Sequence, residues 1–225
     1  MTRRFTLLDA ATVIVTVVIA ALAVWVFTQA PEGPYPMHFN ASGEVDRWGD
    51  RNELALVLGF MAAMSAITAG MMGWYAEAAE DAARRRSLRA GQLISLISIG
   101  GTTAIIAWAS LGGAAEAGGM SPAWPMALTG LILAAVGAGL GRVGPNPLVG
   151  VRTPWSYKSR LAWDRSNRLA GRLFFWIGLG LVLAAPVAPQ PEGSVAMVVL
   201  ILIAALWPIF ESWRVWRADP DRQPF

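Results

Sequence analysis

Residues 7–27 read LLDAATVIVTVVIAALAVWVF, a run in which Asp9 is the only charged residue. A helix rises about 1.5 Å per residue, so a bilayer core about 30 Å thick needs about 20 apolar residues. This run meets that requirement. Because lipid offers backbone N–H and C=O groups no hydrogen-bonding partner, we expect the run to form a transmembrane α-helix.

Five more apolar segments follow along the chain, at residues 53–75, 91–111, 123–140, 173–187 and 194–210. The segment at 173–187 is short and is ended by prolines, so we expect it to be tilted little or to begin a turn earlier. Only 15% of the residues are charged, whereas soluble domains carry about 25%. The sequence therefore predicts an all-α polytopic membrane protein, a bundle of about six transmembrane helices.

We expect one membrane domain over residues 1–225, built from three helical hairpins. The first hairpin covers 7–75 and contains a structured outer loop at 31–52. The second covers 91–140. A basic cytoplasmic segment at 141–172 then leads to the third hairpin at 173–210.

The basic residues fix the expected orientation, because lysine and arginine are retained on the cytoplasmic side of a membrane. In a six-helix arrangement almost all of them fall on one side. They are Arg3, Arg4, Arg84, Arg85, Arg86, Arg89, Arg142, Arg152, Lys158, Arg160, Arg165, Arg168, Arg172, Arg214, Arg217 and Arg222. The opposite side has only Arg47 and Arg51. We therefore expect both termini in the cytoplasm and a multi-pass protein of the cell membrane. A signal peptide cleaved after Ala30 is the alternative, but the run is long for an apolar region of 7–15 residues.

Composition excludes several kinds of chemistry. The chain has no cysteine, which excludes disulfides and thiolate nucleophiles, and its single histidine, His38, excludes a histidine-rich zinc site. The net charge of +3 fits retention beside anionic lipid better than nucleic acid, so we expect membrane lipid as a contact and no nucleic-acid partner. No charge lies near the middle of an expected helix, which disfavours an ion pump. We expect no enzymatic activity and no cofactor.

The outer segment 31–52 reads PEGPYPMHFNASGEVDRWGDRN, and its prolines and glycines predict defined turns. His38, Asp46 and Asp50 are candidate ligands for a metal ion. One imidazole and two carboxylates form a thin ligand set, however, and Asp46 can pair with Arg47 or Arg51 instead. We expect no metal.

The inner segment 141–172 reads GRVGPNPLVGVRTPWSYKSRLAWDRSNRLAGR and has seven basic residues but one acid, Asp164. Ser156 or Ser159 is placed to cap a helix that runs towards Leu173. Aromatic residues interleave with the basic ones, which is typical of a segment in the lipid headgroup region.

Small and polar residues inside the helices predict how the helices pack, because small side chains let membrane helices approach closely. The small residues are Gly130, Ala134, Ala138, Gly137, Gly141, Gly178 and Gly180. The polar residues of the third helix are Gln92, Ser95, Ser98, Thr102 and Thr103. The polar set lines a small cavity in one interpretation and makes hydrogen bonds between helices in the other, which we favour.

Both unusual segments resemble a known family. The outer residues Pro36, His38, Phe39, Asn40, Gly43, Asp46, Arg47, Trp48 and Gly49 resemble the P-x-H-F-N…G…D-R-W-G signature of the domain of unknown function at the N-terminus of SdpI-family proteins. The inner residues Asn146, Gly150, Arg152, Thr153, Pro154, Trp155 and Ser156 are similar to that family's N-x-x-x-G-[IV]-R-T-P-W-[TS] motif. Trp163, Arg168 and Gly171 match the tryptophan, arginine and glycine that follow. Many relatives have histidine where this chain has Asn167.

The resemblance implies immunity of a bacterial cell to a membrane-active toxin peptide, and signalling through a cytoplasmic repressor. On this view the outer residues bind a ligand outside the cytoplasm, and the inner residues form a readout or structural element. Two other functions stay open. One is a transporter of small molecules, lipids or peptides along the polar residues of the third helix. The other is an interfacial enzyme that uses His38 and Asp46 as acid–base partners.

Overall fold

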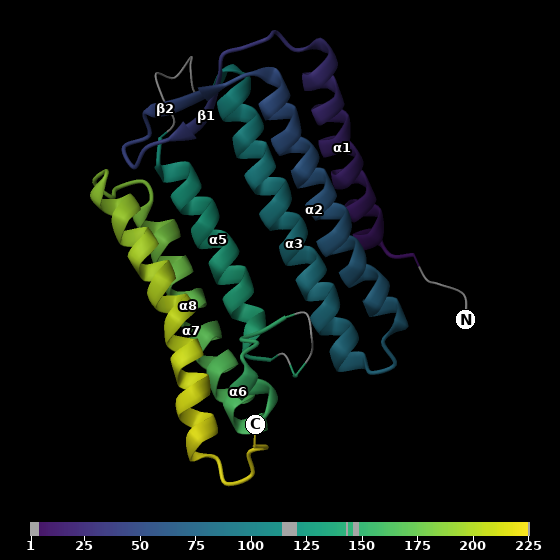
Figure 1. The fold of residues 1–225 in the computed structure, drawn as a ribbon, viewed down its shortest axis with the longest axis vertical. Coiled ribbons are helices and arrows are strands. Elements are labelled where there is room, and N and C mark those ends of the chain that lie inside the picture. The colour runs from purple at the N-terminus through teal and green to yellow at the C-terminus, as the bar shows by residue number, and fades with distance from the viewer. Residues whose placement is uncertain (1–4, 114–120, 143, 146–148, 225) are drawn as a thin grey trace.

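The computed structural model describes residues 5–113, 121–142, 144–145 and 149–224 (Figure 1). In this part of the chain, six helices are long and apolar enough to cross a membrane. They are α1 (Leu7–Gln29), α2 (Arg51–Ala78), α3 (Ala82–Trp108), α5 (Ala123–Leu140), α7 (Arg160–Ala184) and α8 (Glu192–Ala218). The predicted bundle of six helices is confirmed.

Four short elements complete the described structure. A π-helical turn, η1 (Ala109–Gly113), continues α3, and α6 (Pro154–Tyr157) precedes α7. Strands β1 (Tyr35–Phe39) and β2 (Val45–Gly49) pair as an antiparallel hairpin. The predicted structured loop at 31–52 thus contains a β-hairpin, so the helical fold carries one small sheet that the sequence did not reveal.

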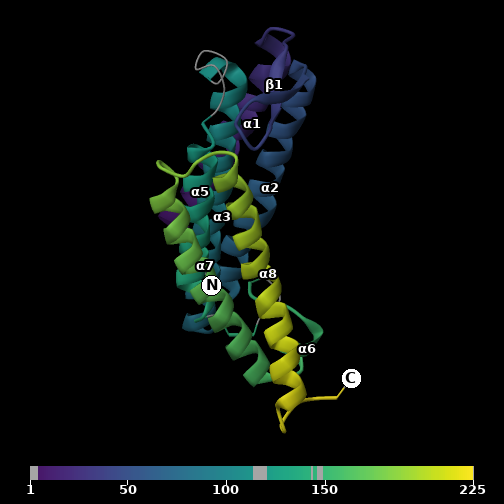
Figure 2. The same cartoon turned by 90° about the vertical axis from the view of Figure 1, so that its left-hand side faces the viewer.

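The six helices form two three-helix units that lie side by side (Figures 1 and 2). In the first unit α2 packs between α1 and α3. In the second unit α7 packs against both α5 and α8, and α5 and α7 make the most extensive contact in the molecule. Contact between α3 and α5 joins the two units.

The connections between helices lie at the two ends of the bundle, and the two ends differ in their content of basic residues (Figure 1). The β-hairpin and the turn between α7 and α8 lie at one end, which we call the outer end. The turn between α2 and α3, helix α6 and the end of α8 lie at the other, the inner end, together with the start of α1. The arginine-rich connections therefore share the inner end. That this end faces the cytoplasm stays a prediction from the positive-inside rule.

Two helices start much earlier than their apolar segments indicate. Helix α3 begins at Ala82 instead of 91, with Asp81 accepting the backbone N–H of Arg84 at 2.8 Å. Helix α7 begins at Arg160 instead of 173, and Ser159 accepts the N–H of Ala162 at 2.9 Å, which confirms the predicted cap. Hydropathy reports only the part of a helix inside hydrocarbon, whereas a capped helix continues into the headgroup region, where arginine side chains reach water.

Glycines hold α5 and α7 together at backbone contact. A Cβ atom added at Gly137 would lie 2.3 Å from the backbone N of Phe175, and one at Gly178 would lie 2.4 Å from the backbone O of Gly130. Gly171 meets Gly137 and Gly141 in the same way. The predicted close packing through small residues is therefore present, except that Gly180 faces open space.

We expect Gly178→Ala to destabilise the protein by about 1–3 kcal/mol, because the added methyl group must separate two backbones that touch. Thermal unfolding in detergent, followed by the fraction of protein that stays monodisperse, measures the effect. Gly180→Ala on the same helix is the matched control and should leave the melting temperature unchanged. Equal melting temperatures for Gly178→Ala and the unsubstituted chain would contradict this packing.

Candidate functional site

The outer hairpin is attached to η1 and to the start of α2. Ser110 in η1 donates its hydroxyl hydrogen to the backbone O of Pro36 at 2.9 Å, and both groups are buried. The hydroxyl of Tyr35 donates to the backbone O of Pro31 at 2.8 Å. Arg47 forms an ion pair with Glu53 in the first turn of α2. These contacts hold the hairpin in one position above the first helical unit.

Two of the predicted outer residues shape the turn between the strands. The side-chain Oδ1 of Asn40 accepts the backbone N–H groups of Ser42 and Glu44 at 2.9 and 3.0 Å. Gly43 has a φ of +88°, a conformation that residues with a Cβ rarely adopt. Asn40 and Gly43 therefore have structural roles in the turn, which makes them less available to a ligand. Pro36 is also less available, because it is buried.

Four predicted outer residues are exposed, namely His38, Asp46, Arg47 and Trp48. His38 Nδ1 and Asp46 Oδ1 lie 2.6 Å apart across the strands, and both side chains face solvent. The indole of Trp48 is 51% exposed, and Phe39 is half-buried. Irregular register on both sides of His38 twists the hairpin locally, a feature that re-aims side chains. The hairpin therefore presents a hydrogen-bonded imidazole–carboxylate pair and a large apolar ring to solvent.

Asp46 thus pairs with His38, and not with Arg47 or Arg51 as the sequence suggested. Asp50 caps α2 by accepting the N–H of Glu53 at 2.8 Å. The carboxylate of Asp50 therefore has a structural role as a helix cap. The three candidate metal ligands, His38, Asp46 and Asp50, do not converge on one point. Among the described residues, no group of three histidines or carboxylates is placed to hold a metal ion.

The inner motif is organised around Asn167. The side-chain Oδ1 of Asn167 accepts the backbone N–H of Val151 at 2.7 Å, and its Nδ2 donates to the backbone O of Trp163 at 2.9 Å. Gly150 has a φ of +130°, and a Cβ atom there would lie 2.8 Å from Asn167 Oδ1 and 2.9 Å from the Trp163 ring. Trp163 is fully buried. The glycine, the tryptophan and the asparagine therefore fit together as one unit.

The next residues of the motif form a capped turn that is joined to α8. Thr153 and Ser156 make reciprocal side-chain to backbone hydrogen bonds of 3.0 Å around Pro154, the first residue of α6. The hydroxyl of Thr153 also lies 2.8 Å from that of Ser212 in α8. Ser159 donates to the buried carboxylate of Asp219, just beyond α8. The motif thus fastens the end of α8 to the start of α7.

Three of the other predicted inner residues lie at the surface of this unit. Arg152 and Arg168 are exposed, and Trp155 is half-buried. Gly171 is used in the contact between α5 and α7. Asn146 lies outside the described residues.

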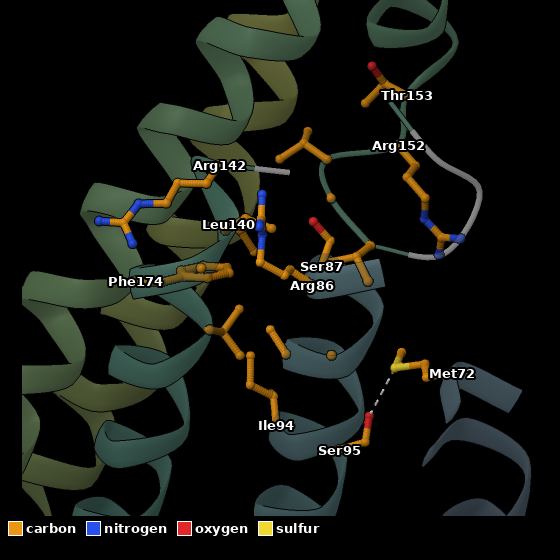
Figure 3. Close-up of a pocket in the computed structure, with 18 of the residues that line it drawn as sticks. Met72, Arg86, Ser87, Ile94, Ser95, Leu140, Arg142, Arg152, Thr153 and Phe174 are labelled. Carbon is orange, nitrogen blue, oxygen red and sulfur yellow. Dashed lines mark hydrogen bonds between the residues drawn. The ribbon is translucent and has the colours of Figure 1, made fainter. Parts of the chain in front are cut away.

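A cavity of about 930 Å³ lies beside the inner motif, between the two three-helix units (Figure 3). Three arginines line it, each from a different segment: Arg86 from α3, Arg142 after α5, and Arg152. The rest of the lining is mostly apolar and includes Ile94, Leu140 and Phe174. The sequence identified Arg152 but not the cavity, because its walls come from helices far apart along the chain.

A charged cluster near the inner end was also missed. Arg89 in α3 bonds to Asp9 in α1 and, at 2.6 Å, to Glu77 in α2. Its pairing joins all three helices of the first unit. A lone aspartate in an otherwise uncharged helix was the signal that could have revealed it, because such a residue needs a cationic partner.

The polar residues of α3 mostly make structural hydrogen bonds. Gln92 donates to Asp9 at 3.1 Å and to Thr12 at 2.9 Å, which are interhelical bonds of the favoured kind. Ser98 and Thr103 donate to backbone carbonyls of α3 itself. Only Ser95 of this set is among the described residues that line the cavity. A continuous polar route along α3 is therefore not formed.

We expect Asn167→Ala to lower the free energy of unfolding by about 1–3 kcal/mol, because the part-buried N–H of Val151 loses its acceptor. Thermal unfolding of the purified protein tests this. Arg165→Ala, an exposed change on the same helix, should have little effect. If both variants melt at the temperature of the unsubstituted chain, Asn167 does not organise the motif.

Both regions are similar to known protein families. Residues 14–63, which include the outer hairpin, match the domain of unknown function DUF1648. Residues 142–212, which include the inner motif, match the SdpI/YfhL protein family. No curated protein and no solved structure matches the chain. The chain is therefore a multi-pass membrane protein in which a segment similar to the SdpI/YfhL family follows a segment similar to DUF1648, and the predicted resemblance to the SdpI family is confirmed.

Proposed function

We propose that this protein gives the cell immunity to a membrane-active toxin peptide, and that the outer hairpin binds the toxin. The observation that supports this most directly is the exposed group of His38, Asp46 and Trp48 on a firmly attached hairpin. Rigid side chains on a fixed support bind at a low cost in conformational entropy. The match to the SdpI/YfhL family supports the same function.

The chemistry of the hairpin suits a peptide that disturbs membranes. Such peptides are commonly rich in lysine and arginine on one face and apolar on the other. Segment 31–52 carries four acidic residues against two arginines, and Trp48 adds an apolar surface. Within the described chain, β2 pairs only with β1, so its second edge can take up an extended peptide strand.

The inner motif is the readout element in this proposal. It joins α7 to α8 and leaves Arg152 and Trp155 at the inner end, where a cytoplasmic repressor would dock. Transport is the second candidate, supported by the cavity between the two units but not by a polar route along α3. We assign no catalytic step to His38 and Asp46.

His38→Ala and Asp46→Ala should each abolish protection, because either change removes the pair that faces the toxin. A sensitive bacterium that expresses the intact chain is first challenged with a panel of membrane-active peptides. Membrane depolarisation and survival are then compared between variants for any peptide against which the intact chain protects.

The matched control is Ser42→Ala at the tip of the same hairpin. Ser42 is exposed, and its hydrogen bond to Asn40 uses the backbone N–H, so the change preserves the turn. This variant should protect as well as the intact chain. Full protection by His38→Ala and Asp46→Ala, at equal amounts in the membrane, would eliminate the hairpin as the toxin site.

A further inference from the structure

A groove lies where α5 and α7 touch near the inner end, and we call it the basic groove because three arginines line it. They are Arg142, just past α5, and Arg168 and Arg172 of α7. The volume of the basic groove is about 310 Å³. It is separate from the cavity between the two units, although Arg142 borders both.

The three arginines occupy neighbouring positions. A Cβ atom added at Gly141 would lie 3.4 Å from Cα of Arg168, and Arg142 follows Gly141 directly. Arg168 and Arg172 are four residues apart, a spacing that places side chains next to one another on a helix. Figure 3 shows the side chain of Arg142 directed away from Arg152, to the other side of the cavity. Three long cationic side chains can therefore reach one anion in the basic groove.

The charges of these arginines are not balanced within the described part of the chain. There, none of the three guanidinium groups forms a hydrogen bond or an ion pair, and no aspartate or glutamate lines the groove. Asp164, the only acid of segment 141–172, pairs with Arg160, with 3.4 Å between Oδ1 and Nε. Guanidinium groups bind phosphate through paired, charge-assisted hydrogen bonds. The basic groove therefore favours an anion with several oxygen acceptors.

An apolar groove borders the basic one along α7. Trp176, one turn past Arg172 and 65% exposed, lines both grooves. The apolar groove has a volume of about 480 Å³, and its lining includes Ile177 and Gly180 of α7 and Leu200 of α8. A Cβ atom added at Gly180 would meet open space. An exposed apolar channel therefore starts beside the arginines and follows the helix towards the outer end.

The level of the two grooves matches the parts of a lipid. Arg172 directly precedes the apolar segment that begins at Leu173, so the arginines lie where hydrocarbon meets the headgroups. Gly180 lies eight residues past Arg172, which is about 12 Å at 1.5 Å per residue. An acyl chain covers this length, because it spans half of a bilayer core about 30 Å thick.

We propose that these two grooves together bind one anionic phospholipid from the leaflet at the inner end. Its phosphate lies among Arg142, Arg168 and Arg172, and one acyl chain passes Trp176 into the apolar groove at Gly180. Free phosphate would neutralise the arginines but leave the apolar groove uncovered. A lipid without net charge would cover the apolar groove but leave the arginines without an anion. An anionic phospholipid matches both grooves.

Binding to the purified full chain in detergent tests the proposal, with phosphatidylglycerol, phosphatidylcholine and inorganic phosphate as probes and native mass spectrometry as readout. Phosphatidylglycerol should bind best to the intact chain. The double variant Arg168→Gln with Arg172→Gln should weaken its binding about tenfold or more, because two charge-assisted hydrogen-bonding groups are lost. The matched control is Arg84→Gln with Arg165→Gln, two exposed arginines outside the groove, and it should bind like the intact chain.

A second variant separates lipid from free phosphate. Gly180→Trp fills the apolar groove from a position with open space, so it should reduce binding of phosphatidylglycerol while leaving the arginines in place. Equal binding of phosphatidylglycerol to the intact chain and to the double arginine variant would overturn the proposal. So would phosphate that displaces the lipid fully while Gly180→Trp has no effect, because that result describes a plain anion site. The grooves and the hairpin are separate sites, so these results do not depend on the toxin proposal.

Discussion

The structure depends on one constraint, that hydrocarbon offers no partner to a polar group. Each such group inside the bundle must then find its partner within the protein. None of the described buried side-chain nitrogen and oxygen atoms lacks a hydrogen bond. Arg89 takes two carboxylates from neighbouring helices, Asn167 uses both ends of its amide, and Ser110 satisfies a carbonyl of the hairpin. The same bonds that remove the cost of burial also fix how the segments are placed.

This placement divides the molecule into parts with different roles. The hairpin is held at the outer end by bonds to η1 and α2, so its exposed residues have a fixed geometry. The inner motif joins α7 and α8 and builds part of the wall of the cavity. Glycines bring α5 and α7 to backbone contact, whereas α3 and α5 touch less closely and leave the cavity between the units.

The number of membrane helices could be predicted from the sequence, because the thickness of the bilayer core sets the length of each apolar segment. The sequence was insufficient for their ends, since α3 and α7 continue past the hydrocarbon with capped, arginine-rich turns. The segment 31–52 was recognised as structured, but short irregular strands such as Tyr35–Phe39 give no clear period-two pattern. The contacts of Asn167 and Arg89 and the cavity depend on residues distant in the chain, which no local pattern reports.

The roles proposed for the two ends of the bundle require that the hairpin faces outwards and that the arginine-rich end faces the cytoplasm. The chain has no cysteine, so a single introduced thiol reports one position without interference. Ala41→Cys at the tip of the hairpin and Arg165→Cys on α7 place that thiol at exposed sites on opposite ends. A membrane-impermeant maleimide should label Ala41→Cys in intact cells and Arg165→Cys only after lysis. Labelling of Arg165→Cys in intact cells, with Ala41→Cys protected until lysis, would contradict this orientation and the roles that follow from it.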